Sequence, residues 1–232
     1  TAYGPAFDMD ASTTANGRVF NRRRQFGTMI LSRWPILWSR LHLLPMRRMI
    51  DPLNTQNPAL ECLIHTPAGP IRFLSIHLAH VGCEERLAQI DHLLALHHAV
   101  PAQGGPWSGT DDEPLRDWTH GEAEPACPQT AIWLGDFNCE PGSAEHARIT
   151  GHSPYHPGAR YTGGLSNATP ADAALHTHVK VIDGQLTKRQ LDHCFVSTNL
   201  VPRVRAVTVR NDDSASDHHP LWVEIDLETP LV

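Results

Sequence analysis

AIWLGDFNCEPGS, residues 131–143, joins an apolar run to a group of polar side chains. Residues 130–137 have the length and the composition of a buried β-strand. Asp136 lies near the end of that run, Asn138 follows two positions later, and a Pro-Gly pair then predicts a turn. We therefore expect the strand to end where it presents Asp136 and Asn138 together, before the chain turns away.

Further strands are predicted on both sides of this stretch. Residues 60–66 and 71–78 are β-rich runs separated by Pro-Ala-Gly-Pro, which predicts a hairpin. Residues 1–12 have a loop-like composition, so we expect the chain to open in a loop. The remaining segments predicted as strands are 28–36, 191–197, 204–210 and 220–227.

Two segments predict helices. In residues 83–100 the apolar side chains recur close to a 3.6-residue period, with acidic residues in the first turn, as the helix dipole favours. Residues 143–150 predict a shorter helix with Ser143 as its N-cap. Strands with a helix inserted between them indicate a layered α/β or α+β fold. We expect residues 1–232 to form one domain.

Residues 101–129 differ from the rest of the chain, because Pro, Gly and acidic residues dominate them. A loop of this length inside a compact domain is usually either functional or disordered. Two interpretations stay open here, a lid over a site and a mobile insertion.

Composition excludes several classes of protein. The formal net charge of −6 argues against a broad basic surface for nucleic acid, although a local basic groove stays open. No apolar run reaches the length of a membrane span. The five cysteines are odd in number and irregular in spacing, which argues against a disulfide framework and a zinc knuckle. We expect a monomer with free thiols in the cytoplasm.

Polar side chains recur at the predicted strand ends, on four separate segments. Each of them has an ordinary explanation alone, such as an Asx turn or a half-buried histidine. A carboxylate inside an apolar run also needs a partner. If the strands lie side by side, these ends converge, and one shared site explains them better than separate accidents. The candidate residues are His77, Asp136, Asn138, Asp192, Asp217 and His218.

The motifs LGDFN, QLDHCFVS and SDHHP, with LSIHL and GTMILSRWPI upstream, resemble those of the endonuclease/exonuclease/phosphatase superfamily, whose members include DNase I-like nucleases. The resemblance runs from about Phe26 to Leu227. It implies a four-layer α/β/β/α sandwich that hydrolyses a phosphate ester with a divalent metal. Oxygen ligands suit Mg²⁺ or Mn²⁺ better than zinc.

The resemblance also implies a role for each residue. His218 would be the general base or a donor to the phosphate, and Asp192 would hold its tautomer. Asp136 would orient or deprotonate the attacking water. Asn138 would hydrogen-bond that water or a phosphate oxygen, and His77 would donate to a non-bridging oxygen.

The metal ligands depart from the family pattern. By resemblance Asp217 would help to hold the metal, but the Glu that family members carry at the end of a second strand has no counterpart before residue 28. Asp8 and Asp10 are poorly placed to replace it. Two interpretations follow: a fragment that lacks its first strands, which we favour, or a natural variant without the main ligand.

The substrate is less defined by the sequence. We expect hydrolysis of a phosphodiester, in nucleic acid or in a small or lipid-linked ester. The alternatives are a catalytically inactive binding module on the same fold and a phosphomonoesterase. Arg22–Arg24 and the pair Arg47 and Arg48 could contact phosphates or be solvated, and stacking aromatic residues interleaved with basic ones are not evident.

Overall fold

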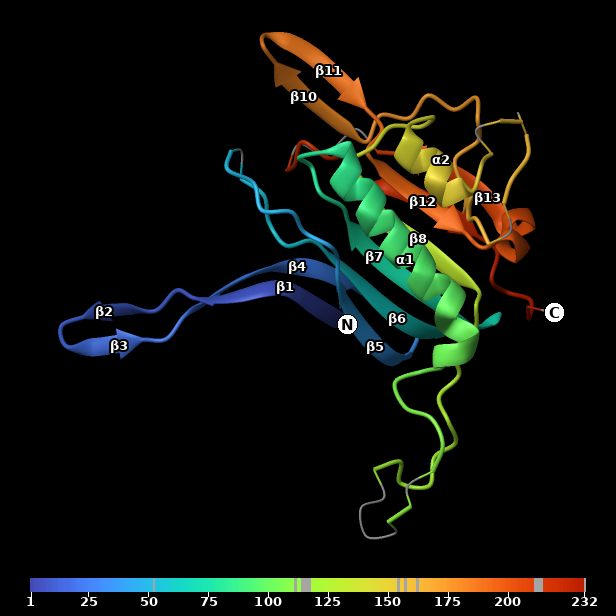
Figure 1. Ribbon diagram of the computed structural model, residues 1–232, viewed down its shortest axis with the longest axis horizontal. Helices are drawn as coiled ribbons and strands as arrows, with labels where there is room; N and C mark the ends of the chain where they lie inside the picture. The colour runs from blue at the N-terminus through green and yellow to red at the C-terminus, as the bar shows by residue number, and fades with distance from the viewer. Residues whose placement is uncertain are drawn as a thin grey trace.

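A mixed sheet of six strands forms the centre of the molecule (Figure 1). The computed structural model describes residues 1–51, 53–110, 112–113, 118–153, 155–156, 158–161, 163–210 and 215–231. The strand order is β5 (Ile36–Leu43), β6 (Pro58–Thr66), β7 (Gly69–His77), β8 (Ala131–Asp136), β12 (Asp192–Val196) and β9 (Ser166–Asn167). Within this sheet β7 and β8 are parallel, and the other neighbours are antiparallel.

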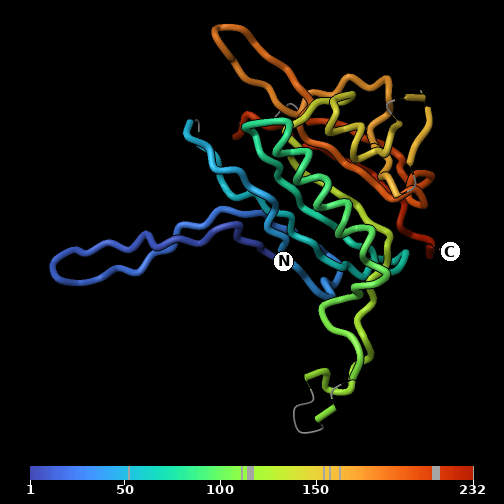
Figure 2. Tube along the Cα trace, in the orientation of Figure 1, coloured from blue at the N-terminus to red at the C-terminus, as the bar shows by residue number. Residues whose placement is uncertain are grey.

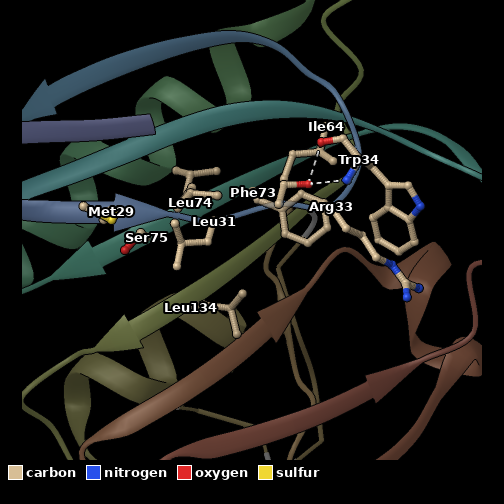
Figure 3. Close-up of a pocket in the computed structure, with 11 residues that line it drawn as sticks. Met29, Leu31, Arg33, Trp34, Ile64, Phe73, Leu74, Ser75 and Leu134 are labelled. Atoms are coloured by element: carbon tan, nitrogen blue, oxygen red, sulfur yellow. Dashed lines mark hydrogen bonds between the residues drawn. The ribbon is translucent and has the colours of Figure 1, made fainter. Parts of the chain in front are cut away.

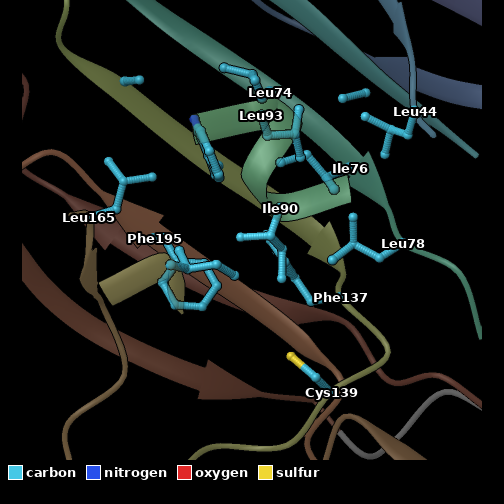
Figure 4. Packing of buried hydrophobic residues seen from close by; sticks show 14 residues of the cluster. Leu44, Leu74, Ile76, Leu78, Ile90, Leu93, Phe137, Cys139, Leu165 and Phe195 are labelled. Carbon is cyan, nitrogen blue, oxygen red and sulfur yellow. The ribbon is translucent and has the colours of Figure 1, made fainter. Parts of the chain in front are cut away.

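The parallel pair requires a crossover, which α1 (Cys83–Gln103) provides. Together with α2 (Ala144–Thr150), α1 covers one face of the sheet (Figure 1). Ile90 and Leu93 of α1 belong to a buried cluster with side chains of the sheet such as Ile76 and Phe195 (Figure 4). No helix in the described ranges is long and apolar enough to cross a membrane.

Two hairpins cover the other face. One consists of β1 (Ala2–Asp10) and β4 (Arg23–Ile30), which packs over β6. The other consists of β13 (Val204–Val209) and β14 (Leu221–Ile225), which packs on Ile132 and Cys194; the 3₁₀-helix η1 (Thr198–Arg203) precedes it. The expected α+β sandwich is confirmed. Within the described residues no helix covers these hairpins. The helices, the central sheet and the hairpins therefore supply three of the four expected layers.

The hairpin layer leaves an apolar groove on the sheet (Figure 3). Its volume is about 420 Å³. Met29, Leu31 and Trp34 line one side, whereas Phe73 and Leu134 come from the sheet. The groove therefore exposes side chains of the same sheet face that the hairpins bury elsewhere.

Most of the predicted elements are confirmed. The hairpin predicted at 60–66 and 71–78 is β6–β7, and the helix predicted at 83–100 is α1, which continues to Gln103. Ser143 is the N-cap of α2, since its hydroxyl accepts the His146 N–H (3.2 Å). The strands expected at 191–197, 204–210 and 220–227 are β12, β13 and β14.

Two predictions were wrong. Residues 1–12 were expected to be a loop, but most of them form β1, because β4 supplies the backbone partners along its length. The single strand expected at 28–36 is two strands. The Ser32 hydroxyl accepts the Trp34 N–H (3.0 Å), which makes a turn between β4 and β5.

Two ribbons that the sequence did not predict leave the body of the molecule (Figure 2). One extends β1–β4 through β2 (Thr13–Ala15) and β3 (Arg18–Phe20). The other pairs β10 (His178–Ile182) with β11 (Gln185–Arg189). Its two-residue turn, Asp183-Gly184, has φ of 50° and 77°, the left-handed conformation that tight hairpins require.

The described part of the 101–129 loop lies at the far end of β8 from Asp136 (Figure 1). Its base is fixed by two backbone contacts, in which the Trp38 indole donates to the Ala126 carbonyl (3.0 Å) and Arg40 donates to that of Gly105 (2.8 Å). This position argues against a lid over Asp136. Residues 111 and 114–117 of the loop lie outside the described residues.

A buried ionic network lies between the sheet and α1. Arg72 donates to Glu61 (2.6 Å) and to His97 Nδ1 (2.8 Å), while the His42 ring lies 2.8 Å from the second Glu61 oxygen. Burial lowers the pKa of His97 to about 4, so its neutral ring accepts from the guanidinium at neutral pH. The hydrogen bonds of Glu61 outweigh its desolvation and lower its pKa.

Replacing Arg72 by Met tests this network. The Arg72 and Glu61 side chains are 3% and 4% exposed, so the substitution leaves a buried carboxylate without its guanidinium partner. We expect the free energy of unfolding, measured by urea denaturation, to fall by about 3–5 kcal/mol. The control is Arg205→Met, which removes a solvent-exposed pair with Asp226 and should have a much smaller effect. Equal losses in the two variants would contradict the interpretation.

Candidate active site

Three of the predicted residues form a row across the sheet. His77 ends β7, Asp136 ends β8 and Asp192 begins β12. The strand register places His77 beside Asp136 and Asp136 beside Asp192. Because side chains alternate along a strand, all three share the face of Leu134, which is the face that carries the hairpins.

The sequence around Asp136 explains how the strand ends there. Gly135 has φ of 139°, and a Cβ at this position would collide with a backbone carbonyl of β7, so glycine is needed. Phe137 points into the core and is fully buried. Asn138 has φ of 49°, a left-handed conformation that Asn tolerates. Asp136 and Asn138 therefore lie on the side away from the core.

Asp136 lies between two imidazoles. Its Oδ2 atom is 3.7 Å from His77 Nε2 and 3.8 Å from His218 Nε2. On its other side the His218 ring is fixed, because Nδ1 lies 2.8 Å from Asp192 Oδ2. The segment that carries His218 is distant in sequence, and it joins the row only in the folded chain.

The environment moves the pKa values of these groups in different directions. The hydrogen bond to Asp192 raises the pKa of His218. Burial lowers the pKa of His77 and raises that of Asp136. The site thus combines an imidazole that favours its protonated form with one that favours its neutral form, on either side of a single carboxyl group. Such a set can bind an anion and accept a proton from water.

Asn138 fixes the orientation of Asp136. Its backbone N–H donates to Asp136 Oδ1 (2.8 Å), which is an Asx turn. Its side-chain amide donates to the Leu78 carbonyl (2.9 Å) and to Asp136 Oδ2 (3.2 Å). Asn138 is therefore built into the site as a support of the carboxylate. Its expected contact with water or phosphate stays a prediction.

Thr177 and His178 hold the site together, and sequence analysis missed both. The buried Thr177 hydroxyl accepts the N–H groups of Leu191 (3.0 Å) and Asp192 (2.9 Å), and its carbonyl accepts the N–H of His219 (2.6 Å). The His178 ring packs edge-on against His218, with centroids 4.9 Å apart. No local pattern marks these residues, because their partners lie in other segments.

Asp217 was expected to hold a metal. Its Oδ2 atom lies 3.4 Å from Lys180 Nζ and 3.6 Å from His178 Nε2, so an ammonium group already faces this carboxylate. No three His, Cys, Asp or Glu side chains of the described segments form a metal-binding group. The side chains described therefore do not fit a complete divalent-cation site, and the metal role of Asp217 stays a prediction.

Comparisons with known proteins agree on the family and the fold. The profile of the Endonuclease/Exonuclease/phosphatase family matches residues 2–218. A family protein from Bacteroides thetaiotaomicron is 19% identical, with a TM-score of 0.53 over 84% of this chain and 65% of that one. A mannosyl-6-phosphatase from Bacteroides thetaiotaomicron VPI-5482 is 16% identical, with a TM-score of 0.53 over 94% and 77%.

A third structure is a 3′ phosphatase from Neisseria bound to a product DNA hairpin, 17% identical, with a TM-score of 0.51 over 94% of this chain and 79% of that one. At these identities the likeness establishes the fold. The chain spans 65% of the length of the first of these structures. A search of curated proteins found no significant match.

The Asp192–His218 pair makes a prediction about titration. Asp192→Asn should lower the pKa of His218, because the carboxylate stabilises the imidazolium. Since the folded-state pKa is raised, the pair stabilises the fold at pH below the usual histidine range, and this contribution is lost as pH rises through the raised pKa. The measurement is NMR titration of the His218 ring. Asp217→Asn, the control, should lower it less, and an unchanged value in Asp192→Asn would refute the assignment.

Proposed function

We propose that this chain, which belongs to the endonuclease/exonuclease/phosphatase family, hydrolyses a phosphodiester bond. Members of the family are hydrolases that act on phosphate esters. The observation that supports the proposal is the position of Asp136 Oδ2, which lies within 3.8 Å of both the His77 and the His218 rings. The reacting phosphate would lie between these two rings.

Each residue then has a part in the reaction. Asp136 orients the attacking water and accepts its proton as the new P–O bond forms and the bond to the leaving group breaks. The raised pKa of His218 favours the imidazolium, so of its two expected roles we favour the donor to a phosphate oxygen. His77, whose pKa burial lowers, donates as a neutral ring. Asp192 keeps the His218 ring in place.

The charge of the site favours a diester over a monoester. A phosphodiester carries one negative charge, whereas a monoester carries up to two near neutral pH. Asp136 and Asp192 both lie beside the phosphate position, and a dianion would be repelled more strongly there. A phosphomonoesterase is the second candidate, since two of the similar structures are phosphatases.

The catalytically inactive binding module is the third candidate. The incomplete set of metal ligands in the described residues favours it, and the ordered row of His77, Asp136 and Asp192 opposes it. Family enzymes generally use divalent metals, so we propose Mg²⁺ or Mn²⁺ as the cofactor. The five cysteines are free; the cytoplasmic location and the monomer both stay predictions.

The proposal predicts the behaviour of two variants. His218→Ala and Asp136→Asn should each lower kcat for bis-p-nitrophenyl phosphate by about 10²–10⁴-fold, the loss expected when positioned acid–base groups are removed. The matched control is His65→Ala, since His65 is an exposed residue of β6 opposite Pro70, at the other end of β7 from His77. Assays with Mg²⁺, with Mn²⁺ and with a chelator test the cofactor.

The substrate comparison separates the three candidates. Faster turnover of p-nitrophenyl phosphate than of the diester would favour the phosphomonoesterase. No turnover of either ester with any of the metals would favour the binding module. Full activity of both site variants would end the proposal.

A further inference from the structure

Both projecting ribbons begin against an imidazole of the site. The β1–β4 ribbon meets His77 through Phe26, whose ring centroid lies 5.6 Å from that of His77. The β10–β11 ribbon meets His218 through His178, with centroids 4.9 Å apart. The position proposed for the reacting phosphate is therefore bordered by one ribbon on the His77 side and by the other on the His218 side.

The β1–β4 ribbon presents aromatic and basic side chains on the face that meets the site. Phe7 pairs with Phe26 across the ribbon, and their rings stack at 5.6 Å with an interplanar angle of 24°. Arg24 lies two residues further from the site along β4. It shares the face of Phe26, because side chains two positions apart on a strand point to the same side. Its neighbour Arg23 lies on the opposite face, where it pairs with Asp8 (2.7 Å).

This pairing corrects the view from sequence alone. Arg24 and Phe26 are only two positions apart in the sequence, but residues 23–27 were not predicted as a strand, so neither the face that they share nor the pairing of Phe26 with Phe7 was evident. The register of β1 and β4 brings the two rings together and places Arg24 next to them.

The β10–β11 ribbon likewise carries a ring and basic side chains on one face, the face of His178 that meets the site, which is called its inner face. Lys180 and Arg189 share this face with His178, as the register shows. Lys180 Nζ lies 3.4 Å from Asp217 Oδ2, and both side chains remain about half exposed, at 57% and 48%. Lys188 lies on the opposite face of the ribbon. Each ribbon thus carries a ring at the site and a cation two residues further out.

We propose that the substrate is a single strand of nucleic acid that crosses the site, with Arg24 and Lys180 binding phosphates on opposite sides of the scissile one. A base next to that phosphate stacks on Phe26. This inference rests on the proposed function and names its substrate class. A ligand that binds both cations extends in two directions from the reacting phosphate. A ligand that stacks on Phe26 also offers a flat ring, and a nucleic-acid strand has both properties.

The net charge of −6 is consistent with this assignment, because the cations act locally.

Removal of one phosphate contact lowers the slope of log K against log salt by about 0.7 for a single strand. Loss of one stacked base weakens binding by about 5- to 150-fold. A small diester engages neither ribbon fully, so the variants should affect it less.

The experiment measures binding and turnover separately. Binding of a labelled oligothymidylate of about 12 nucleotides, within the usual range of site sizes, is followed by fluorescence anisotropy in a chelator at several salt concentrations. Arg24→Ala and Lys180→Ala should each reduce the salt slope by about 0.7, and Phe26→Leu should weaken binding. Lys180→Arg keeps the positive charge and should therefore show the salt slope of the wild-type protein. The controls Arg23→Ala and Lys188→Ala change cations on the opposite faces and should leave binding unchanged.

In turnover assays, Arg24→Ala and Lys180→Ala should raise KM for the oligonucleotide more than KM for bis-p-nitrophenyl phosphate. Absence of oligonucleotide binding by the wild-type protein, or equal effects of the inner-face and outer-face variants, would overturn the inference. So would tighter binding to anionic phospholipid vesicles than to the oligonucleotide. Because binding is measured without turnover, failure of hydrolysis alone would count against the proposed function and not against this assignment.

Discussion

The register of three strands is the constraint on which the site depends. His77, Asp136 and Asp192 meet because β8 runs parallel to β7 and antiparallel to β12, with those residues in one row. A shift of one residue in either pairing would turn Asp136 away from one partner and into the core layer. Gly135 permits the close approach of β8 to β7 at this row, and α1 makes the parallel connection possible.

Much of this arrangement was predictable from local sequence. The apolar run before Asp136 predicts its strand, and the polar ends of several strands predict one site. What could not be predicted depends on pairing between distant segments. The strand β1 forms only because β4 is its partner, and Thr177 matters only because the N–H of Asp192 donates to its hydroxyl. The pattern of apolar residues within a short segment of sequence does not reveal the pairing of β1 with β4 or the contacts of Thr177.

The two ends of β7 and β8 serve different purposes. At one end, Arg72 and Glu61 form a buried ion pair that ties the sheet to α1 through His97. At the other end, the side chains of His77, Asp136, Asp192 and His218 are only partly buried, with exposed fractions of 19–31%. The same sheet therefore separates a permanently satisfied ionic network from one whose members have opposing pKa shifts. The buried ion pair and the candidate site therefore use different residues of one sheet.

The short turn of the β10–β11 ribbon has a structural consequence. Asp183-Gly184 closes a two-stranded ladder whose first pair is His178 and Arg189, and the His178 ring packs against His218 of the candidate site. Adding or removing rungs at that tip would change how far the arm reaches without moving any member of the His77 row. Insertions or deletions at this solvent-facing bend would therefore lengthen or shorten the ribbon while leaving the row of His77, Asp136 and Asp192 in place.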